Sequence, residues 1–152
     1  MNKGTAREFS QHARARARRS AIQAYYQWQI ASQPVENIIR EFEQDRAEIK
    51  KADFDYFRDL MTGMTKHTEE LDEALGAVLD RPVAELDPVE RAVLHLGTYE
   101  MIHHAELPWR VIINESIELA KMFGAEQSHK YINGVLDKIA HRYRAAETAN
   151  TS

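Results

Sequence analysis

The chain has 152 residues, with 20 Lys and Arg against 24 Asp and Glu and no cysteine. Its length suits one domain with a substantial core, and the lack of cysteine excludes a disulfide framework, a thiolate zinc site and a cysteine nucleophile. No apolar run approaches the roughly 18 residues of a membrane span, so we expect a soluble cytoplasmic protein without a membrane partner.

Charge is unevenly distributed along the chain. The segment from Met1 to Arg19 has six basic side chains and one acidic side chain, whereas the other 133 residues hold 14 Lys or Arg and 23 Asp or Glu. A basic segment on an acidic protein is typical of a local surface that binds a polyanion. We predict a flexible basic N-terminal arm over residues 1–12, one helical domain over residues 13–144 and a disordered tail over residues 145–152.

The apolar residues recur at helical rather than alternating spacing, which predicts an all-α fold. Asp53 and Asp87 are suitable helix N-caps. Pro88 and Pro108 suit helix starts, and Gly124 suits a helix end. The helices are expected over residues 13–31, 35–45, 53–81 with a break near Gly63 or His67, from 88 onward, 108–124 and 125–143.

Asn133 and Gly134 lie inside the last predicted helix. A glycine within a helix costs roughly 1 kcal/mol relative to alanine, so this one needs a reason. We interpret Gly134 as permitting close helix packing and Asn133 as bonding buried backbone, in preference to a direct binding role for either.

No catalytic constellation is recognisable. The seven histidines form no His-Glu-x-x-His motif, and the adjacent His103 and His104 would point about 100° apart on a helix. Glu115 and Glu118 are close enough on one helix to share a proton, but a structural role for Glu115 is favoured. With no phosphate loop, dinucleotide fingerprint or nucleophile elbow, we predict no enzymatic activity, no cofactor and no metal site.

The basic segment combines arginines with tyrosines. In a helix, Arg14, Arg18 and Tyr25 fall in one row, flanked by Arg16 and Arg19. Arginines beside aromatic rings suit single-stranded nucleic acid, where stacking contributes about 1–3 kcal/mol per base. Two other interpretations are a solvated basic face and a cleaved organelle presequence. The presequence is disfavoured because the arginines continue without a break into the first predicted core helix.

Four segments, in the expected order, resemble the bacterial NusB family of transcription antitermination factors. The stretch VIINESIELAKMFGAEQSHKYINGVLD over residues 111–137 closely resembles the family signature. The other matches are an arginine-rich start leading into AIQAYYQW, then YFRDL, and PVERAVL continuing to Tyr99 and Glu100. Together they cover roughly residues 14–140.

The resemblance implies about seven helices in two small packed bundles, and no catalysis. Members of the family bind the boxA element of nascent RNA together with the ribosomal protein NusE. The complex is loaded onto elongating RNA polymerase and suppresses premature termination, notably on ribosomal RNA operons. We therefore expect single-stranded boxA RNA, NusE and the RNA polymerase elongation complex with other Nus factors as partners.

The resemblance also implies site residues. Expected RNA contacts are Arg14, Arg16, Arg18, Tyr26, Phe123, Gln127 and Lys130, and the charge of the basic segment adds Arg19 to them. Glu90 matches the family acid associated with the NusE side, and Glu100 is a second acid suited to a basic partner. Backbone N–H groups of residues 125–128, at the start of the last helix, are expected to form an anion site.

Two alternatives stay open. A purely protein-binding helical adaptor would use the arginine-rich segment on an acidic partner. An RNA methyltransferase can have an accessory domain of this fold, but the chain leaves no room for a catalytic domain, so this alternative is disfavoured.

Overall fold

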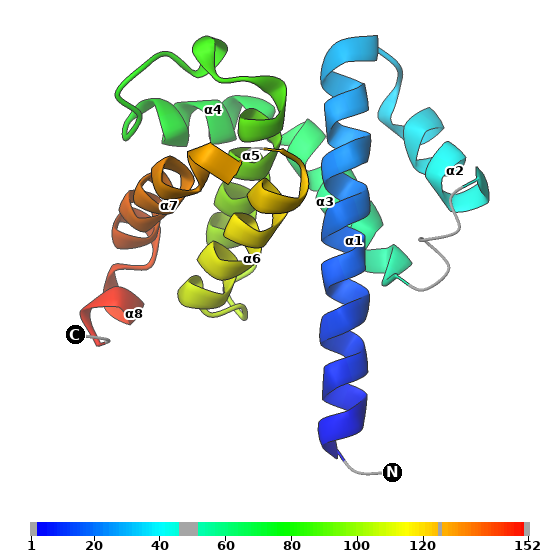
Figure 1. The fold of residues 1–152 in the computed structure, drawn as a ribbon, viewed down its shortest axis with the longest axis horizontal. Helices are drawn as coiled ribbons and strands as arrows, with labels where there is room; N and C mark the ends of the chain where they lie inside the picture. Colours follow the sequence, from blue (N-terminus) through cyan, green and yellow to red (C-terminus); the bar gives the residue numbers. More distant parts are fainter. Residues whose placement is uncertain (1–2, 46–51, 125, 151–152) are drawn as a thin grey trace. The chain divides into compact units, whose positions relative to one another are not determined.

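A computed structural model describes residues 3–45, 52–124 and 126–150 of the chain (Figure 1). Within these ranges it contains eight α-helices, two short 3₁₀ helices and no strand, which confirms the predicted all-α fold. The chain divides into two compact units, Met1–Thr65 and Lys66–Ser152. None of the helices in the described ranges has the length and apolar character needed to cross a membrane.

The first unit consists of three helices, α1 (Lys3–Ala31), α2 (Val35–Asp45) and α3 (Phe54–Lys66). Helix α1 therefore begins inside the predicted arm, and the side chains of residues 3–10 lie outside the described part of the chain. After α1, Ser32 adopts a left-handed φ of 52°, which turns the chain toward Pro34 and the start of α2.

Aromatic packing and one helix cap organise the first unit. The rings of Phe42 on α2 and Phe57 on α3 stack with their centroids 5.7 Å apart. The Asp53 carboxylate accepts the backbone N–H of Tyr56 at 3.0 Å, which confirms the predicted N-cap. The backbone N–H of Asp53 donates to the carbonyl of Ala13 at 3.0 Å, so the start of α3 is also fixed to α1.

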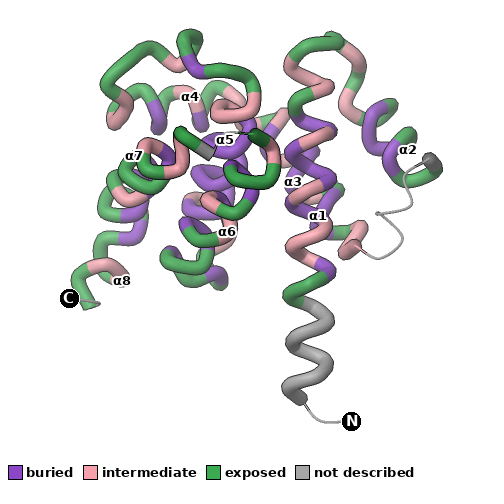
Figure 2. Tube along the Cα trace, viewed as in Figure 1, coloured by how far each residue is buried: buried purple, intermediate pink, exposed green. Residues whose placement is uncertain are grey.

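The second unit is built around one buried helix, α5 (Pro88–His103). Ten consecutive residues of α5, from Ala92 to Met101, are buried, and much of what Figure 2 shows of this helix is purple. Helices α4, α6 and α7 all pack against it. The other elements are α4 (Thr68–Gly76), α6 (Trp109–Met122), α7 (His129–Tyr143), α8 (Ala145–Ala149) and 3₁₀ helices at Val83–Glu85 and Glu126–Ser128.

A glycine lets α6 and α7 approach α5 closely. A Cβ placed on Gly97 of α5 would lie 2.9 Å from both Leu136 Cδ1 and Ser116 Oγ, closer than real side chains come. Gly134, for which we predicted this role, is exposed and has nothing within 4 Å of its Cβ position. Asn133 is exposed as well, so the structural interpretation of this pair is wrong.

Arg144 closes the C-terminal end of α5 from inside the unit. Its guanidinium donates to the carbonyls of Met101 and Leu107 at 2.8 Å and of His104 at 2.9 Å. It also donates to the Glu147 carboxylate at 2.7 Å. The last carbonyls of a helix have no partner within that helix, so this one side chain supplies what α5 lacks.

The segment after Arg144 forms the short helix α8, where sequence analysis predicts a disordered tail over residues 145–152. Glu147 of α8 accepts the backbone N–H of Trp109 at 3.1 Å in addition to its bond with Arg144. Glu147 thus connects α8 to the start of α6. The residues after Arg144 do not by themselves indicate this long-range contact.

The predicted helix over residues 53–81 is two helices. The chain breaks at His67, one of the two predicted positions, and α4 then ends at Gly76 rather than at Arg81. Beyond Gly76, the backbone N–H of Val78 donates to the carbonyl of Leu75 at 3.0 Å. This three-residue spacing tightens the last turn and ends the helix.

Candidate nucleic-acid interface

The arginines of α1 lie on two sides of the helix. A helix turns by about 100° per residue, which places Arg14, Arg18 and Tyr25 on one side. Arg16, Arg19 and Tyr26 lie on the other side. The first side faces inward, since Tyr25 is fully buried and Arg18 is 3% exposed. Tyr26, on the second side, is 41% exposed. The row of Arg14, Arg18 and Tyr25 predicted from the sequence therefore lies on the inward side, and the flanking Arg16 and Arg19 lie on the other side.

The inward arginines pack on a tyrosine of α3. The guanidinium carbons of Arg14 and Arg18 lie 5.1 and 5.5 Å from the centroid of the Tyr56 ring. Cation–π contacts of this kind contribute about 0.5–2 kcal/mol, depending on desolvation. The structure does not place Arg18 on the surface, so the prediction of a direct RNA contact there is corrected. Arg14 is half-buried.

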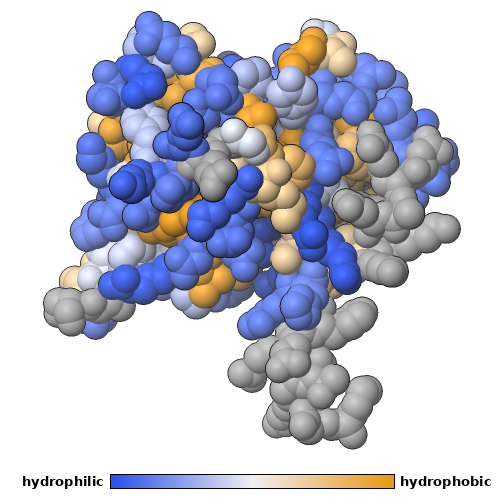
Figure 3. Space-filling view, viewed as in Figure 1, coloured by the Kyte–Doolittle hydropathy of each residue, from blue (hydrophilic) through white to orange (hydrophobic). Residues whose placement is uncertain are grey.

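Arg16 and Arg19 are half-exposed and share their side of α1 with the exposed Tyr26. We call these three residues the outer α1 face. The described surface visible in Figure 3 is mainly hydrophilic, with small hydrophobic patches between polar side chains. Two cations and an aromatic ring on one side of a helix can hold phosphates and stack a base.

The turn between α6 and α7 holds the other predicted RNA contacts. Gly124 has a φ of 87°, a left-handed conformation that suits glycine and ends α6 as predicted. Phe123 is half-buried, whereas Gln127 and Lys130 are exposed. Part of the predicted backbone anion site, Ala125, lies outside the described residues.

A shallow cavity of about 250 Å³ lies beside Lys130 in the second unit. Asp80, Tyr131 and Lys138 line it together with Lys130. The Tyr131 hydroxyl donates to Asp80 Oδ1 at 3.1 Å, and Arg81 Nε donates to the same oxygen at 3.1 Å. The guanidinium carbon of Arg81 also lies 4.5 Å from the Tyr131 ring centroid.

These contacts shift the pKa values of Asp80 and Tyr131. The hydrogen bond from Arg81, with a second from Tyr131, holds the pKa of the Asp80 carboxyl below its usual value. Burial, and then the bond to Asp80, raise the pKa of the Tyr131 phenol. Arg81 and Tyr131 were not among the site residues predicted from the sequence. No spacing pattern joins them, because they lie in separate elements far apart in the chain.

The two predicted partner-binding acids differ in exposure. Glu90 is half-buried in the first turn of α5, where its N–H donates to the Asp87 carboxylate at 2.9 Å and confirms the predicted cap. Burial, then the neighbouring Asp87, raise the pKa of Glu90. Glu100 is fully buried in α5. The prediction that Glu100 contacts a partner is therefore corrected, because a fully buried side chain cannot reach a partner.

A model of the NusB family matches residues 15–141 of the chain. The chain is 50% identical over 135 residues to the transcription antitermination protein NusB of Nitrosococcus oceani. The aligned region covers 88% of this chain and 89% of the relative. The family resemblance inferred from the sequence motifs is thereby confirmed.

Solved structures share the fold. NusB of T. maritima superposes with a TM-score of 0.72 at 29% identity, covering 85% of this chain and 91% of that chain. A crystal structure of the antitermination factors NusB and NusE in complex with dsRNA gives a TM-score of 0.69 at 25% identity, covering 85% of this chain and 96% of that chain. The chain therefore belongs to the NusB family, a non-enzymatic family of transcription antitermination proteins.

Proposed function

We propose that the chain binds boxA-type single-stranded RNA together with ribosomal protein NusE in the cytoplasm. The complex joins the RNA polymerase elongation complex with other Nus factors and promotes transcription of ribosomal RNA operons. The name of its 50% identical relative supports the antitermination role. The similar structure that contains NusB, NusE and dsRNA supports the pairing of a protein partner with RNA.

The outer α1 face is the observation on which this proposal mainly rests. Arg16 and Arg19 are close enough on the helix to approach consecutive phosphates, and Tyr26 offers an exposed ring nearby on the same side. Arg18, bound to Tyr56 from the inside, has a positioning role in which it supports the helix that presents this face. The net negative charge of the whole chain restricts polyanion binding to such local basic surfaces.

A second RNA contact is proposed at the turn after α6 and the start of α7. Lys130 and Gln127 are exposed there, with Phe123 half-buried at the end of α6. Beside Lys130, the Arg81 guanidinium lies against the Tyr131 ring, a cation and an aromatic face that suit a base and its phosphate. We assign NusE to the region of Glu90, because an acid at this position suits a basic ribosomal protein.

The test is fluorescence anisotropy of a labelled boxA-type single-stranded RNA, a scrambled single strand and a duplex of the boxA sequence. Each RNA is titrated with the full chain at several salt concentrations, with and without NusE from the same organism. We expect the boxA single strand to bind more tightly than the scrambled strand, and NusE to increase the difference. Equal, weak and salt-sensitive binding of all three RNAs, even with NusE, would favour the protein-binding adaptor instead.

Variants separate the outer α1 face from general charge effects. For single strands, log K changes by about −0.7 per log unit of salt for each phosphate neutralised, so Arg16→Ala with Arg19→Ala should flatten the slope by about 1.4. The matched control, Arg58→Ala with Arg142→Ala, removes two other exposed arginines and the same charge. If both double variants changed the slope equally, the outer α1 face would lose its assignment.

A further inference from the structure

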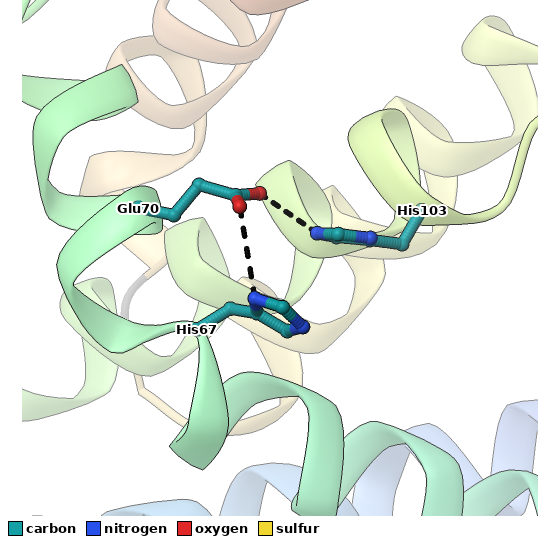
Figure 4. A group of neighbouring side chains, drawn as sticks. All are labelled: His67, Glu70 and His103. Atoms are coloured by element: carbon teal, nitrogen blue, oxygen red, sulfur yellow. Dashed lines mark hydrogen bonds and ion pairs between the residues drawn. The ribbon is translucent and has the colours of Figure 1, made fainter.

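Three side chains that commonly bind metals meet in the second unit, where α4 begins and α5 ends (Figure 4). His67 occupies the turn before α4, Glu70 lies in the first turn of α4, and His103 is the last residue of α5. One ligand atom from each residue lies within 4.8 Å of the other two. The cluster is separate from every residue assigned above to RNA or to NusE.

The carboxylate lies between the two imidazoles. His103 Nε2 is 2.7 Å from Glu70 Oε1, and His67 Nδ1 is 3.6 Å from Glu70 Oε2, so each oxygen faces a different ring. Figure 4 shows both near nitrogens directed at the carboxylate. The two rings stack with centroids 4.5 Å apart, and the Tyr99 ring lies 5.0 Å from that of His103. Ring packing therefore keeps the donor atoms together without a metal.

We propose that His67, Glu70 and His103 bind one divalent transition-metal ion, with Zn²⁺ as the best fit. Two imidazole nitrogens and one carboxylate oxygen are a ligand set that Zn²⁺ accepts at about 2.0–2.2 Å per bond, with water as the fourth ligand. The imidazoles discriminate against Mg²⁺ and Ca²⁺, which prefer oxygen ligands. The side chains of His67, Glu70 and His103 are 31%, 45% and 29% exposed, so water can reach the open position.

The proposed ion would join two helix ends. Helix α4 has no side-chain N-cap, since His67 at the cap position makes no such hydrogen bond. A metal bound by residues at the start of α4 and at the end of α5 would hold the first turn of α4 against the end of α5. Because an ion that binds only the folded form shifts the folding equilibrium, Zn²⁺ is expected to raise the unfolding temperature of the second unit.

The spacing of the histidines in the sequence does not indicate this metal site. Glu70 and His103 are 33 positions apart, and only the packing of α4 on α5 brings them together. The spacing of His67 and Glu70, one helical turn, is common on helix surfaces and does not indicate a site without the third ligand.

The experiment is isothermal titration of the untagged full chain, first dialysed against a chelator, with Zn²⁺ and separately with Mg²⁺. We expect one Zn²⁺ per chain and no Mg²⁺ binding. Glu70→Gln and His103→Asn should each weaken Zn²⁺ binding by at least about tenfold, since loss of even an outer-shell partner typically costs about 10–100-fold. His104→Asn is the matched control, because that ring faces Glu106 at 2.7 Å instead of the cluster.

Substitution of Co²⁺ for Zn²⁺ gives a second readout. A visible absorption band of a four-coordinate Co²⁺ site in the wild type and in His104→Asn, lost in Glu70→Gln and His103→Asn, would support direct ligation. Circular dichroism checks that each variant is folded. The proposal is overturned if the wild type binds no Zn²⁺, or if folded cluster variants keep the wild-type affinity and Co²⁺ spectrum.

Discussion

The outer α1 face and the buried end of α5 use arginine in opposite ways. Arg16 and Arg19 are half-exposed beside an exposed tyrosine, whereas Arg144 is 9% exposed and surrounded by backbone carbonyls of the second unit. A guanidinium has five N–H donors, and those of Arg144 are directed at the protein itself. A count of basic residues therefore does not locate a polyanion surface, because what matters is whether the donors still face solvent.

Among the changes that test this comparison, removal of Arg144 is expected to have the largest effect on stability. Arg144→Ala removes the guanidinium that donates to the carbonyls of Met101, Leu107 and His104, and we expect a loss of about 3 kcal/mol in the free energy of unfolding. Urea denaturation measures it. Arg142→Ala, an exposed arginine two residues earlier, should change stability by less than about 0.5 kcal/mol. Equal losses in the two variants would mean that Arg144 is not a structural arginine.

Two glycines of the second unit, one inside and one on the surface, should respond to substitution by alanine in opposite directions. Gly97→Ala places a methyl group 2.9 Å from Leu136 and Ser116 and should destabilise the protein by about 2 kcal/mol, although alanine favours the helix. Gly134→Ala meets no atom within 4 Å and should stabilise it by about 0.5–1 kcal/mol. Thermal unfolding of both variants tests the pair, and the same sign for both would contradict it.

A buried histidine provides a further interior test. Fully buried His95 contacts Asp72 Oδ1 at 2.6 Å, and Arg91 contacts Oδ2 at 3.1 Å. Burial raises the pKa of Asp72, but hydrogen bonds and charge interactions with His95 and Arg91 together outweigh it and lower that pKa below the ordinary 3.8. A depressed folded-state pKa contributes stability above pH 3.8 that is lost as pH falls through the folded-state value.

Asp72→Asn should therefore cost about 1.5 kcal/mol at pH 7, through the lost charged partner of a buried ring. The difference from wild type should shrink when urea denaturation is repeated in increasing acid. Asp59→Asn, a half-buried carboxylate of α3, is the control. A difference that stayed constant into strong acid would show that the charge of Asp72 does not contribute.

The smallest expected effect lies on the outer α1 face. Tyr26→Ala should weaken boxA-type RNA binding by about 1 kcal/mol, through one lost stacking contact, and leave the salt slope unchanged. Tyr26→Phe retains the ring and should bind almost as the wild type does. Anisotropy titrations distinguish the cases, and a Phe variant as weak as the Ala variant would assign the contribution to the hydroxyl instead.

Local chemistry made much of the fold predictable. The N-caps at Asp53 and Asp87, the break at His67 and the glycine turn at Gly124 each depend on a few neighbouring residues, and all four occur in the structure. The family motifs extended this to a shared fold, because together they cover most of the chain.

Positions decided by tertiary contacts were harder to predict. Charge alone could not show that Arg18 would turn inward, since that depends on Tyr56 of another helix. The residue type of Glu100 predicts a surface position, because glutamate is almost never fully buried, yet Glu100 is buried in α5. Gly97 was overlooked in favour of Gly134 because only its neighbours Leu136 and Ser116 reveal the close approach.

The distance along the chain between α5 and its closing arginine affects the order of events during synthesis. Arg144 follows Met101 by 43 positions, so the ribosome adds every residue of α5, α6 and α7 to the chain before this arginine. Until then the last carbonyls of α5 must keep water as their partner. The second unit therefore acquires its final stability late in translation, after the residues of the first unit have all emerged.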